Sequence, residues 1–203
     1  MQKDEASGTE KRLTVRSVWT AAAALPHREP LAHDTKTDVL IIGGGMAGLL
    51  CAHRLQQAGV PYLLVEARRI CGGVTGNTTA KITSQHGFLY HQLIRRFGVE
   101  RAQMYLNANE SALQEYRALC AEINCDFEEK DSFVYSLNGR EKIEQELDAL
   151  EKLGYPAEFA ETLPLPFPVD GAVRFPRQAQ FNPLSFAAAI MEGISIFVHT
   201  AVR

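Results

Sequence analysis

The sequence predicts an α/β fold with a parallel sheet, and three consecutive segments carry this prediction. Residues 38–42 form a continuous apolar run, which is typical of a strand buried on both faces. Glycines follow at once, and apolar side chains then recur at helical spacing through residues 46–58. Residues 62–66 form a second apolar strand, which ends in a carboxylate. Strand, helix and strand in this order predict parallel pairing with a right-handed crossover.

The remaining chain is expected to alternate between helices and short strands. Helices are predicted at residues 91–97, 100–122, 141–152 and 183–192, and strands at residues 126–137 and 194–198. Asn182 followed by Pro183 is typical of a helix N-cap and a first-turn proline. Lys142 and Glu146 are expected to form a solvent-facing pair on their helix. Five prolines between residues 155 and 176 predict loop and edge strand there.

Composition and charge exclude several classes of protein. With 46% hydrophobic and 22% charged residues over 203 positions, the chain is neither disordered nor fibrous. Its net charge of -3 gives no general attraction to nucleic acid or to an anionic membrane surface. The longest apolar run, residues 39–52, contains four glycines and is shorter than the roughly 20 residues that span a bilayer. We therefore expect no nucleic-acid partner and no membrane span.

The N-terminus and the cysteines favour a cytoplasmic protein. Residues 1–19 mix both charge signs and contain no apolar segment of the kind that a secretory signal needs. The four cysteines have spacings that fit neither a zinc site nor a small disulfide framework: Cys51, Cys71, Cys120 and Cys125. We expect reduced thiols, no metal site and a cytoplasmic location.

A glycine-rich turn, Gly43-Gly44-Gly45-Met46-Ala47-Gly48, follows the first predicted strand and fits the pattern G-x-G-x-x-G. Gly43 permits a tight turn, Gly45 lets the backbone approach a pyrophosphate, and Gly48 lets the helix lie close to the sheet. The N–H groups at the start of the helix would then face the phosphates. The alternative, a loop that only turns the chain, fits less well because the strand, the helix and the second strand are all in place. The motif therefore predicts a dinucleotide-binding site.

The second predicted strand ends at Glu66, 18 residues after Gly48, where a carboxylate accepts hydrogen bonds from ribose hydroxyls. A ribose 2′-phosphate would be repelled there, which disfavours NADP. Arg68 and Arg69 follow, and their guanidinium groups are placed to flank the adenosine and the pyrophosphate; the alternative is a solvated basic turn. A Gly-Gly pair comes next, where backbone would pass close to an extended cofactor. An NAD-linked dehydrogenase remains an alternative, because the glycine motif alone does not separate FAD from NAD.

The segment from Glu66 to the Gly-Gly pair resembles the second fingerprint of flavoproteins with a glutathione-reductase-like FAD domain. Together with the first strand and the glycine turn, it resembles the FAD-dependent oxidoreductases of the D-amino-acid-oxidase type, which include glycine and sarcosine oxidases. Residues 75–87 are similar to a subset of that family whose members usually carry a C-terminal Rieske iron–sulfur domain. The resemblance resumes at Asn182-Pro183 and at residues 194–202. It therefore covers nearly the whole chain from Val18 onward.

The resemblance implies FAD as the cofactor and a small-molecule amine or amino acid as the substrate. Hydride would pass from the carbon next to the amine to the flavin N5, and water would hydrolyse the resulting imine. A cation near the flavin N1 stabilises the reduced ring, and Lys81 is the candidate for it. His86 is a second candidate, at the border of the ring. The alternatives are a surface lysine and a histidine satisfied within its own loop, and no other catalytic residue is assigned.

The predicted cofactor-binding residues come from the glycine turn, the end of the second strand, the loop after it and the last predicted strand. They are Gly43, Gly45, Met46, Ala47, Gly48, Glu66, Ala67, Arg68, Arg69, Gly72, Gly73, Thr78, Thr79 and Val202. Thr78 and Thr79 would offer hydroxyls to a phosphate or to the flavin ring. The backbone of Val202 falls where members of the family contact adenine.

The resemblance also implies a division of the chain. The expected parts are an N-terminal arm (1–36), a first segment of a Rossmann-like FAD-binding domain (37–98), helices and the start of an α+β substrate domain (99–180), and a return to the FAD-binding domain (181–203). In the family more chain follows, so an FAD-dependent oxidoreductase that is incomplete in these residues is expected. A Rieske [2Fe-2S] domain in the missing part is one partner that the resemblance allows. The alternative is a non-catalytic FAD-binding fragment.

Overall fold

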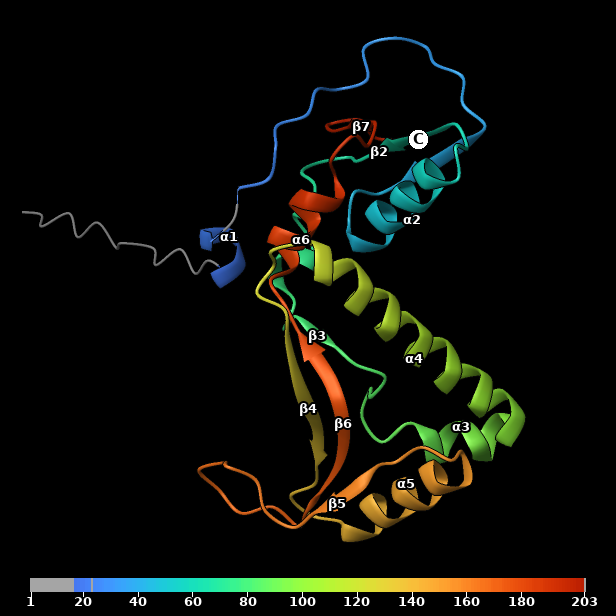
Figure 1. The fold of residues 1–203 in the computed structure, drawn as a ribbon, viewed down its shortest axis with the longest axis vertical. Coiled ribbons are helices and arrows are strands. Elements are labelled where there is room, and N and C mark those ends of the chain that lie inside the picture. Colours follow the sequence, from blue (N-terminus) through green and yellow to red (C-terminus); the bar gives the residue numbers. More distant parts are fainter. Residues whose placement is uncertain (1–16, 23, 203) are drawn as a thin grey trace, which may run out of the picture.

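The structure, a computed structural model, describes residues 17–22 and 24–202 (Figure 1). The helices are α1 (Val18–Ala22), α2 (Met46–Gln57), the short 3-10 helix η1 (Thr75–Asn77), α3 (Tyr90–Phe97), α4 (Val99–Glu122), α5 (Arg140–Lys152) and α6 (Pro183–Ile190). The strands are β1 (Val39–Ile42), β2 (Tyr62–Val65), β3 (Lys81–Ile82), β4 (Glu128–Tyr135), β5 (Glu158–Ala160), β6 (Ala172–Gln180) and β7 (Ile196–Phe197). A parallel sheet of β1, β2 and β7 lies at one end of the molecule and an antiparallel sheet of the other strands lies towards the opposite end, with α4 running between them (Figure 1).

The parallel sheet confirms the predicted α/β fold and its strand–helix–strand unit. β1 pairs with β2 in parallel, with Ile41 opposite Leu64, and β2 pairs in parallel with β7. α2 connects β1 to β2 and packs against both strands and against α6. Ile41 and Leu64 are buried in this core, whereas Leu40 and Ile42 on the other face of β1 are 46% and 66% exposed. Among the described residues, β1 is therefore an edge strand with one apolar face uncovered.

The antiparallel sheet is built around β6, which pairs with β3, β4 and β5. The expectation of loop and edge strand from the five prolines is confirmed for residues 155–171, where β5 is an edge strand followed by a loop, and is wrong for residues 172–176, which belong to the central strand β6. Pro176 lies at an irregularity in the pairing with β4, between the partners of Lys130 and Ser132, and Arg177 beside it has φ +53. At a β-bulge a residue loses its ladder partner, so a proline there removes no sheet hydrogen bond. A central strand therefore tolerates this proline.

The other predicted elements are present with ends that differ by a few residues. α3 begins at Tyr90 and α4 at Val99, and β7 is shorter than predicted. The Asn182 side chain accepts hydrogen bonds from the N–H groups of Leu184 at 3.2 Å and Ser185 at 3.1 Å. These two bonds confirm the N-cap, and Pro183 occupies the first turn of α6 as predicted.

The expectation that Glu146 faces solvent is wrong, because its side chain is 0% exposed. Its carboxylate accepts hydrogen bonds from the backbone N–H groups of Leu89 at 2.8 Å, Tyr90 at 2.8 Å and His91 at 2.9 Å. The start of α3 has no side-chain cap of its own, so α5 supplies an acceptor for these orphan donors. Burial raises the pKa of Glu146, and the three N–H donors oppose that rise. Lys142, its expected partner, is exposed.

α4 joins the two hydrophobic clusters of the molecule. Its Leu113 side chain packs in the cluster beneath the parallel sheet, and its Leu106 side chain packs in the cluster with α3, α5 and β6. In the second cluster the Phe175 ring packs against Tyr90 and Tyr155, with ring centroids 6.0 and 4.7 Å apart. At 1.5 Å per residue, a helix of 24 residues spans roughly 36 Å, which is enough to reach both sheets.

The described residues before β1 pack onto the domain and add no strand to either sheet. We call residues 17–36, apart from residue 23, the N-terminal arm; residues 1–16 of the predicted arm lie outside the described residues. Its helix α1 contacts α6 and η1, and the rest of the arm passes near β7 before it reaches β1 (Figure 1). None of the helices in the described part of the chain is long and apolar enough to cross a membrane.

Candidate functional site

The glycine turn forces α2 close to β1. Gly43 has φ +112, a conformation that side chains other than glycine rarely adopt, and its N–H donates to the Val65 carbonyl at 2.8 Å. A Cβ atom added to Gly48 would lie 2.0 Å from the Gly43 carbonyl oxygen. Glycine is therefore required at both positions for geometric reasons, as the motif predicts.

The N-terminus of α2 opens onto the predicted phosphate site. Gly45 is the N-cap residue, with extended backbone and no side-chain cap. The N–H of Met46 donates to the Thr75 hydroxyl at 3.1 Å, and Ala47 is exposed in the first turn. A Cβ atom on Gly45 would meet only the Thr75 hydroxyl, at 3.5 Å. The helix start thus offers backbone donors and the positive end of the helix dipole on an open surface.

The Glu66 carboxylate is fixed at the end of β2 by two backbone donors. One oxygen accepts from the N–H of Gly44 at 2.7 Å and the other from the N–H of Arg68 at 2.8 Å. A carboxylate has about four lone-pair sites, so each oxygen can still accept another hydrogen bond. The side chain is held beside the glycine turn with acceptor capacity to spare, which suits a ribose diol.

A cavity of about 420 Å³ brings many of the predicted residues together, and we call it the front cavity. Six predicted cofactor-binding residues line it: Gly45, Glu66, Arg68, Arg69, Gly72 and Gly73. Cys71, Val74 and Thr75 complete the lining. It therefore combines one carboxylate, two guanidinium groups and a helix N-terminus, which match ribose hydroxyls and phosphates.

The other predicted residues lie outside the lining of the front cavity. Ala67 is exposed between Glu66 and the two arginines. The Thr78 hydroxyl accepts from the N–H of Ala80 at 3.2 Å, and Thr79 is exposed. Val202 is 51% exposed, and the segment before it is tied to the site because the N–H of Thr200 donates to the Glu66 carbonyl at 3.0 Å.

The two candidate catalytic residues lie further along the chain and apart from the front cavity. Lys81 is exposed on β3, where it pairs with Gln180 of β6. The exposed His86 ring lies near α4, with Nε2 at 3.4 Å from the Asn109 side-chain oxygen and its centroid at 6.5 Å from that of Tyr105. The structure therefore separates these residues from the glycine turn and Glu66.

A buried polar cluster fixes the chain just before His86, and the sequence did not predict it. The Ser84 hydroxyl donates to the Glu110 carboxylate at 2.5 Å, and its N–H donates to the Gln178 side chain at 2.8 Å. The Tyr90 hydroxyl donates to the Ser84 carbonyl at 2.6 Å. Burial raises the pKa of Tyr90, and it raises the pKa of Tyr155 to about 12. Both phenols stay protonated: the Tyr90 hydroxyl donates to the loop after β3, and the Tyr155 hydroxyl accepts from the side-chain N–H of Gln178 at 3.1 Å.

Two further residues at the front cavity were also missed, Thr75 and Cys71. Thr75 contacts α2 through its hydroxyl, and its position two residues after the Gly-Gly pair was the available signal. Cys71 is 4% exposed, and burial, followed by the Glu66 charge, raises the pKa of its thiol to about 11. This thiol stays neutral at physiological pH, so it contributes packing to the cavity wall. Like the other three cysteines, it forms no disulfide.

Comparison with known proteins identifies the family. Residues 38–202 match the DAO family, described as FAD dependent oxidoreductase. The putative Rieske 2Fe-2S iron-sulfur protein YhfW of Bacillus subtilis (strain 168) is 37% identical over 180 residues, a match that covers 87% of this chain and 35% of YhfW. The chain thus spans little more than a third of the length of this relative.

Solved structures show the same fold. An L-proline dehydrogenase from P. horikoshii is similar with a TM-score of 0.67 and 18% identity, over 84% of this chain and 46% of that one. A glycine oxidase from Bacillus cereus ATCC 14579 is similar with a TM-score of 0.53 and 24% identity, over 81% of this chain and 46% of that one. The resemblance noted in the sequence is confirmed, and FAD rather than NAD is the cofactor of the family. The chain belongs to the DAO family of FAD-dependent oxidoreductases.

Proposed function

We propose that this chain forms the first part of an FAD-dependent enzyme that oxidises the C–N bond of an amine or an amino acid. The front cavity is the observation that supports FAD as the cofactor. The start of α2, the Glu66 carboxylate and two arginines line this one space. The names of the structural relatives, L-proline dehydrogenase and glycine oxidase, support an amino-acid substrate. The alternative is a non-catalytic FAD-binding fragment.

Each end of the front cavity suits one part of FAD. The Glu66 carboxylate would accept hydrogen bonds from the ribose hydroxyls. The N–H of Ala47 in the first turn of α2 would face the pyrophosphate, next to Met46, whose own N–H is bonded to the Thr75 hydroxyl. Arg68 and Arg69, which line the same cavity, would neutralise phosphate charge. The backbone at Val202 would contact adenine. This arrangement fits the adenosine diphosphate half of the cofactor.

The flavin half would extend towards Thr78, Thr79 and the start of β3. When bound, the flavin supplies the redox chemistry by accepting a hydride at N5. The protein's own contribution is then to orient the ring and to place charge near it. Lys81, on β3 directly after this turn, is the proposed cation, and His86 is proposed to lie at the border of the substrate site.

We propose that further residues of the full-length protein complete the enzyme. The uncovered apolar face of β1, with Leu40 46% and Ile42 66% exposed, is a surface that a folded protein normally covers. The relative YhfW is named as a Rieske 2Fe-2S protein, and this chain spans 35% of it. We therefore propose a Rieske centre in the full-length protein as the acceptor of electrons from the flavin. The expected signature is the EPR signal of a reduced [2Fe-2S] cluster after substrate is added without oxygen.

The cofactor assignment predicts that Glu66→Gln weakens FAD binding by about 10- to 100-fold. A bond from a hydroxyl to a charged acceptor contributes about 1.5–3 kcal/mol, and the neutral amide retains only part of this. The measurement is titration of full-length apoprotein with FAD. Glu115→Gln is the matched control, because Glu115 is exposed on α4 and pairs with Arg54 away from the cavity. A purified wild-type protein that is colourless and binds NAD would overturn the assignment.

The reaction class has a separate test. Full-length protein is mixed with amines and amino acids without oxygen, and bleaching of the visible flavin absorbance is followed. The expected result is reduction by at least one compound with hydrogen on the carbon next to nitrogen. Reduction only by alcohols or hydroxy acids would overturn C–N oxidation and leave the FAD assignment standing.

The role of Lys81 predicts that Lys81→Met lowers the flavin midpoint potential by about 30 mV, which for two electrons is about 1.4 kcal/mol. The reason is that the reduced ring loses a stabilising positive charge. Spectroelectrochemistry of the full-length holoprotein measures the shift. Lys152→Met on the far helix α5 is the control and should leave the potential unchanged. If Lys81→Met leaves the FAD affinity, the potential and the turnover unaltered, the assigned role is wrong.

A further inference from the structure

The N-terminal arm lies outside the residues that match the family, 38–202, yet it packs against the predicted cofactor site. We call residues 66–80 the cofactor loop. Trp19 in α1 donates its indole N–H to the Thr78 carbonyl at 2.8 Å. The indole is partly buried against the hydrophobic cluster beneath the parallel sheet. One side chain of the arm is thus anchored in the core and bonded to the backbone of the cofactor loop.

The arm also contacts the segment that runs beside the cofactor loop after β7. The N–H of Val198 donates to the Glu29 carbonyl at 3.1 Å, and the N–H of Leu31 donates to the Thr200 hydroxyl at 3.0 Å. Thr200 in turn donates its own N–H to the Glu66 carbonyl at 3.0 Å. The arm, the segment after β7 and the cofactor loop therefore form one hydrogen-bonded layer.

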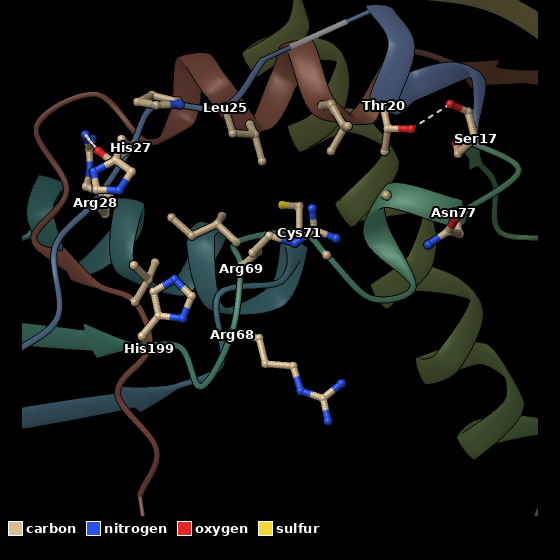
Figure 2. Close-up of a pocket in the computed structure, with 16 residues that line it drawn as sticks. Ser17, Thr20, Leu25, His27, Arg28, Arg68, Arg69, Cys71, Asn77 and His199 are labelled. Carbon is tan, nitrogen blue, oxygen red and sulfur yellow. Dashed lines mark hydrogen bonds between the residues drawn. The ribbon is translucent and has the colours of Figure 1, made fainter. Parts of the chain in front are cut away.

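A second cavity, of about 620 Å³, lies between the arm and the cofactor loop, and we call it the back cavity (Figure 2). Thr20 and Leu25 of the arm lie across it from Arg69 and Cys71 (Figure 2). Arg68, Arg69, Cys71 and Gly72 line both the back cavity and the front cavity. This stretch of the loop therefore separates the two cavities, with Cys71 buried in the core between them.

The turn at the end of the cofactor loop needs support from outside. Ala80 has φ +60, which for a residue with a Cβ atom costs about 1 kcal/mol or more, and it is 2% exposed. The Thr78 hydroxyl accepts from the N–H of Ala80, and the N–H of Phe181 donates to the Ala80 carbonyl at 3.3 Å. The Trp19 indole N–H donates to the carbonyl of Thr78, the first residue of the same turn. It therefore adds a further hydrogen bond, beside the other two, that keeps this strained turn in place.

We infer that Trp19 is a positioning residue for the flavin half of FAD. By holding the Thr78 carbonyl, it fixes the turn that presents Thr79 and Lys81 towards the flavin. The inference rests on the proposed function, because it takes FAD as the ligand. The adenosine diphosphate half is held by the glycine turn and by Glu66, and no hydrogen bond of Trp19 to those residues occurs in the part of the chain that is described. Trp19 thus acts on one half of the cofactor.

The test is the variant Trp19→Phe in the full-length protein, because phenylalanine keeps an aromatic ring and lacks the N–H. Dissociation constants for FAD and for ADP are measured separately on apoprotein by calorimetry. The expected result is that the FAD constant rises about 3- to 10-fold, the effect of one lost hydrogen bond. The ADP constant is expected to stay within about twofold of wild type, because the turn does not touch this half.

Hydrogen exchange of the apoprotein supplies a readout that does not depend on bound cofactor. In Trp19→Phe, the amides of residues 78–82 are expected to exchange faster, while those of β1 and β2 keep their wild-type rates. Thr20→Val is the matched control. It removes the Thr20 hydroxyl bond to the Ser17 carbonyl within the arm, at 2.8 Å, and leaves the Trp19 bond intact. It should change neither dissociation constant.

Four outcomes would overturn the inference. Equal FAD affinity in wild type and Trp19→Phe would show that the bond does not position the site. Equal loss of FAD and ADP affinity, or faster exchange throughout the parallel sheet, would show that Trp19 only stabilises the fold. A wild-type protein that binds FAD no more tightly than ADP would overturn the proposed function as well, whereas the first three outcomes leave that function standing.

Discussion

Replacing Gly48 with alanine is expected to destabilise the parallel-sheet unit by about 3 kcal/mol and to abolish measurable FAD binding. The added Cβ atom would lie 2.0 Å from the Gly43 carbonyl oxygen and 3.4 Å from the Ile41 side chain. The carbonyl belongs to a residue whose N–H is bonded to Val65 in β2, so it cannot turn away without breaking the sheet. α2 must therefore move away from β1, which opens the core beneath it and displaces the helix start from the front cavity.

Gly45→Ala is the contrasting variant, because Gly45 leaves space for the pyrophosphate, whereas Gly48 lets α2 pack closely on β1. Its added Cβ atom would meet only the Thr75 hydroxyl at 3.5 Å, an ordinary contact, and its backbone is extended. The apoprotein should therefore lose only about 0.5–1 kcal/mol, because alanine is a poorer N-cap residue than glycine. FAD binding should still fall by about 100-fold, because the methyl group stands where the pyrophosphate approaches.

The measurement compares the two variants in the full-length protein. Thermal or denaturant unfolding of the apoprotein reports on stability, and FAD titration reports on the site. We expect Gly48→Ala to lower both the stability of the apoprotein and its affinity for FAD. We expect Gly45→Ala to lower mainly the affinity for FAD. A Gly48→Ala protein with wild-type unfolding would contradict the close approach of α2 and β1. A Gly45→Ala protein with wild-type FAD affinity would contradict a pyrophosphate at the start of α2.

Short-range patterns predicted the parallel-sheet unit well, because its causes are local. The glycine spacing, the apolar runs and the Asn182 cap each act within a few residues, so the sequence alone indicates them. β6 was not predicted as a central strand because Pro176 is tolerated only at a bulge, and the bulge depends on the partner strand β4. That partner lies more than 30 residues away, and no local pattern records the pairing.

The candidate site, like the fold, was predicted only where its causes are local in the sequence. Glu66 and the glycine turn were predicted because the motif that joins them is defined by spacing, and the structure brings them into contact. Trp19 was not predicted as part of the site, because its bond to Thr78 joins residues 59 positions apart. Glu146 was placed on the wrong face because helical periodicity treats a carboxylate as solvent-facing. Its burial follows from the orphan N–H groups of a different helix, α3.

Glu146→Ala is accordingly expected to be the most damaging substitution outside the glycine turn, with a loss of about 3–5 kcal/mol. Three backbone donors at the start of α3 would lose their acceptor inside the junction of α3 and α5. Glu146→Gln keeps one carbonyl oxygen but turns an N–H₂ group towards a backbone N–H, so an intermediate loss of about 2 kcal/mol is expected. Glu144→Gln, an exposed control that pairs with Arg140, should change stability by at most about 0.5 kcal/mol.

The pH dependence of these variants separates a buried carboxylate from an ordinary surface one. Because burial raises the pKa of Glu146, the folded protein binds this proton more tightly than the unfolded chain does. Glu146 therefore contributes most stability below the usual carboxyl pKa of 4.5, and part of that contribution is lost as the pH rises through the elevated folded value. The destabilisation by Glu146→Gln should consequently be largest at low pH and shrink across this window in denaturant unfolding. A destabilisation that instead grows with pH would mean that the three N–H donors outweigh burial and hold the pKa below its usual value.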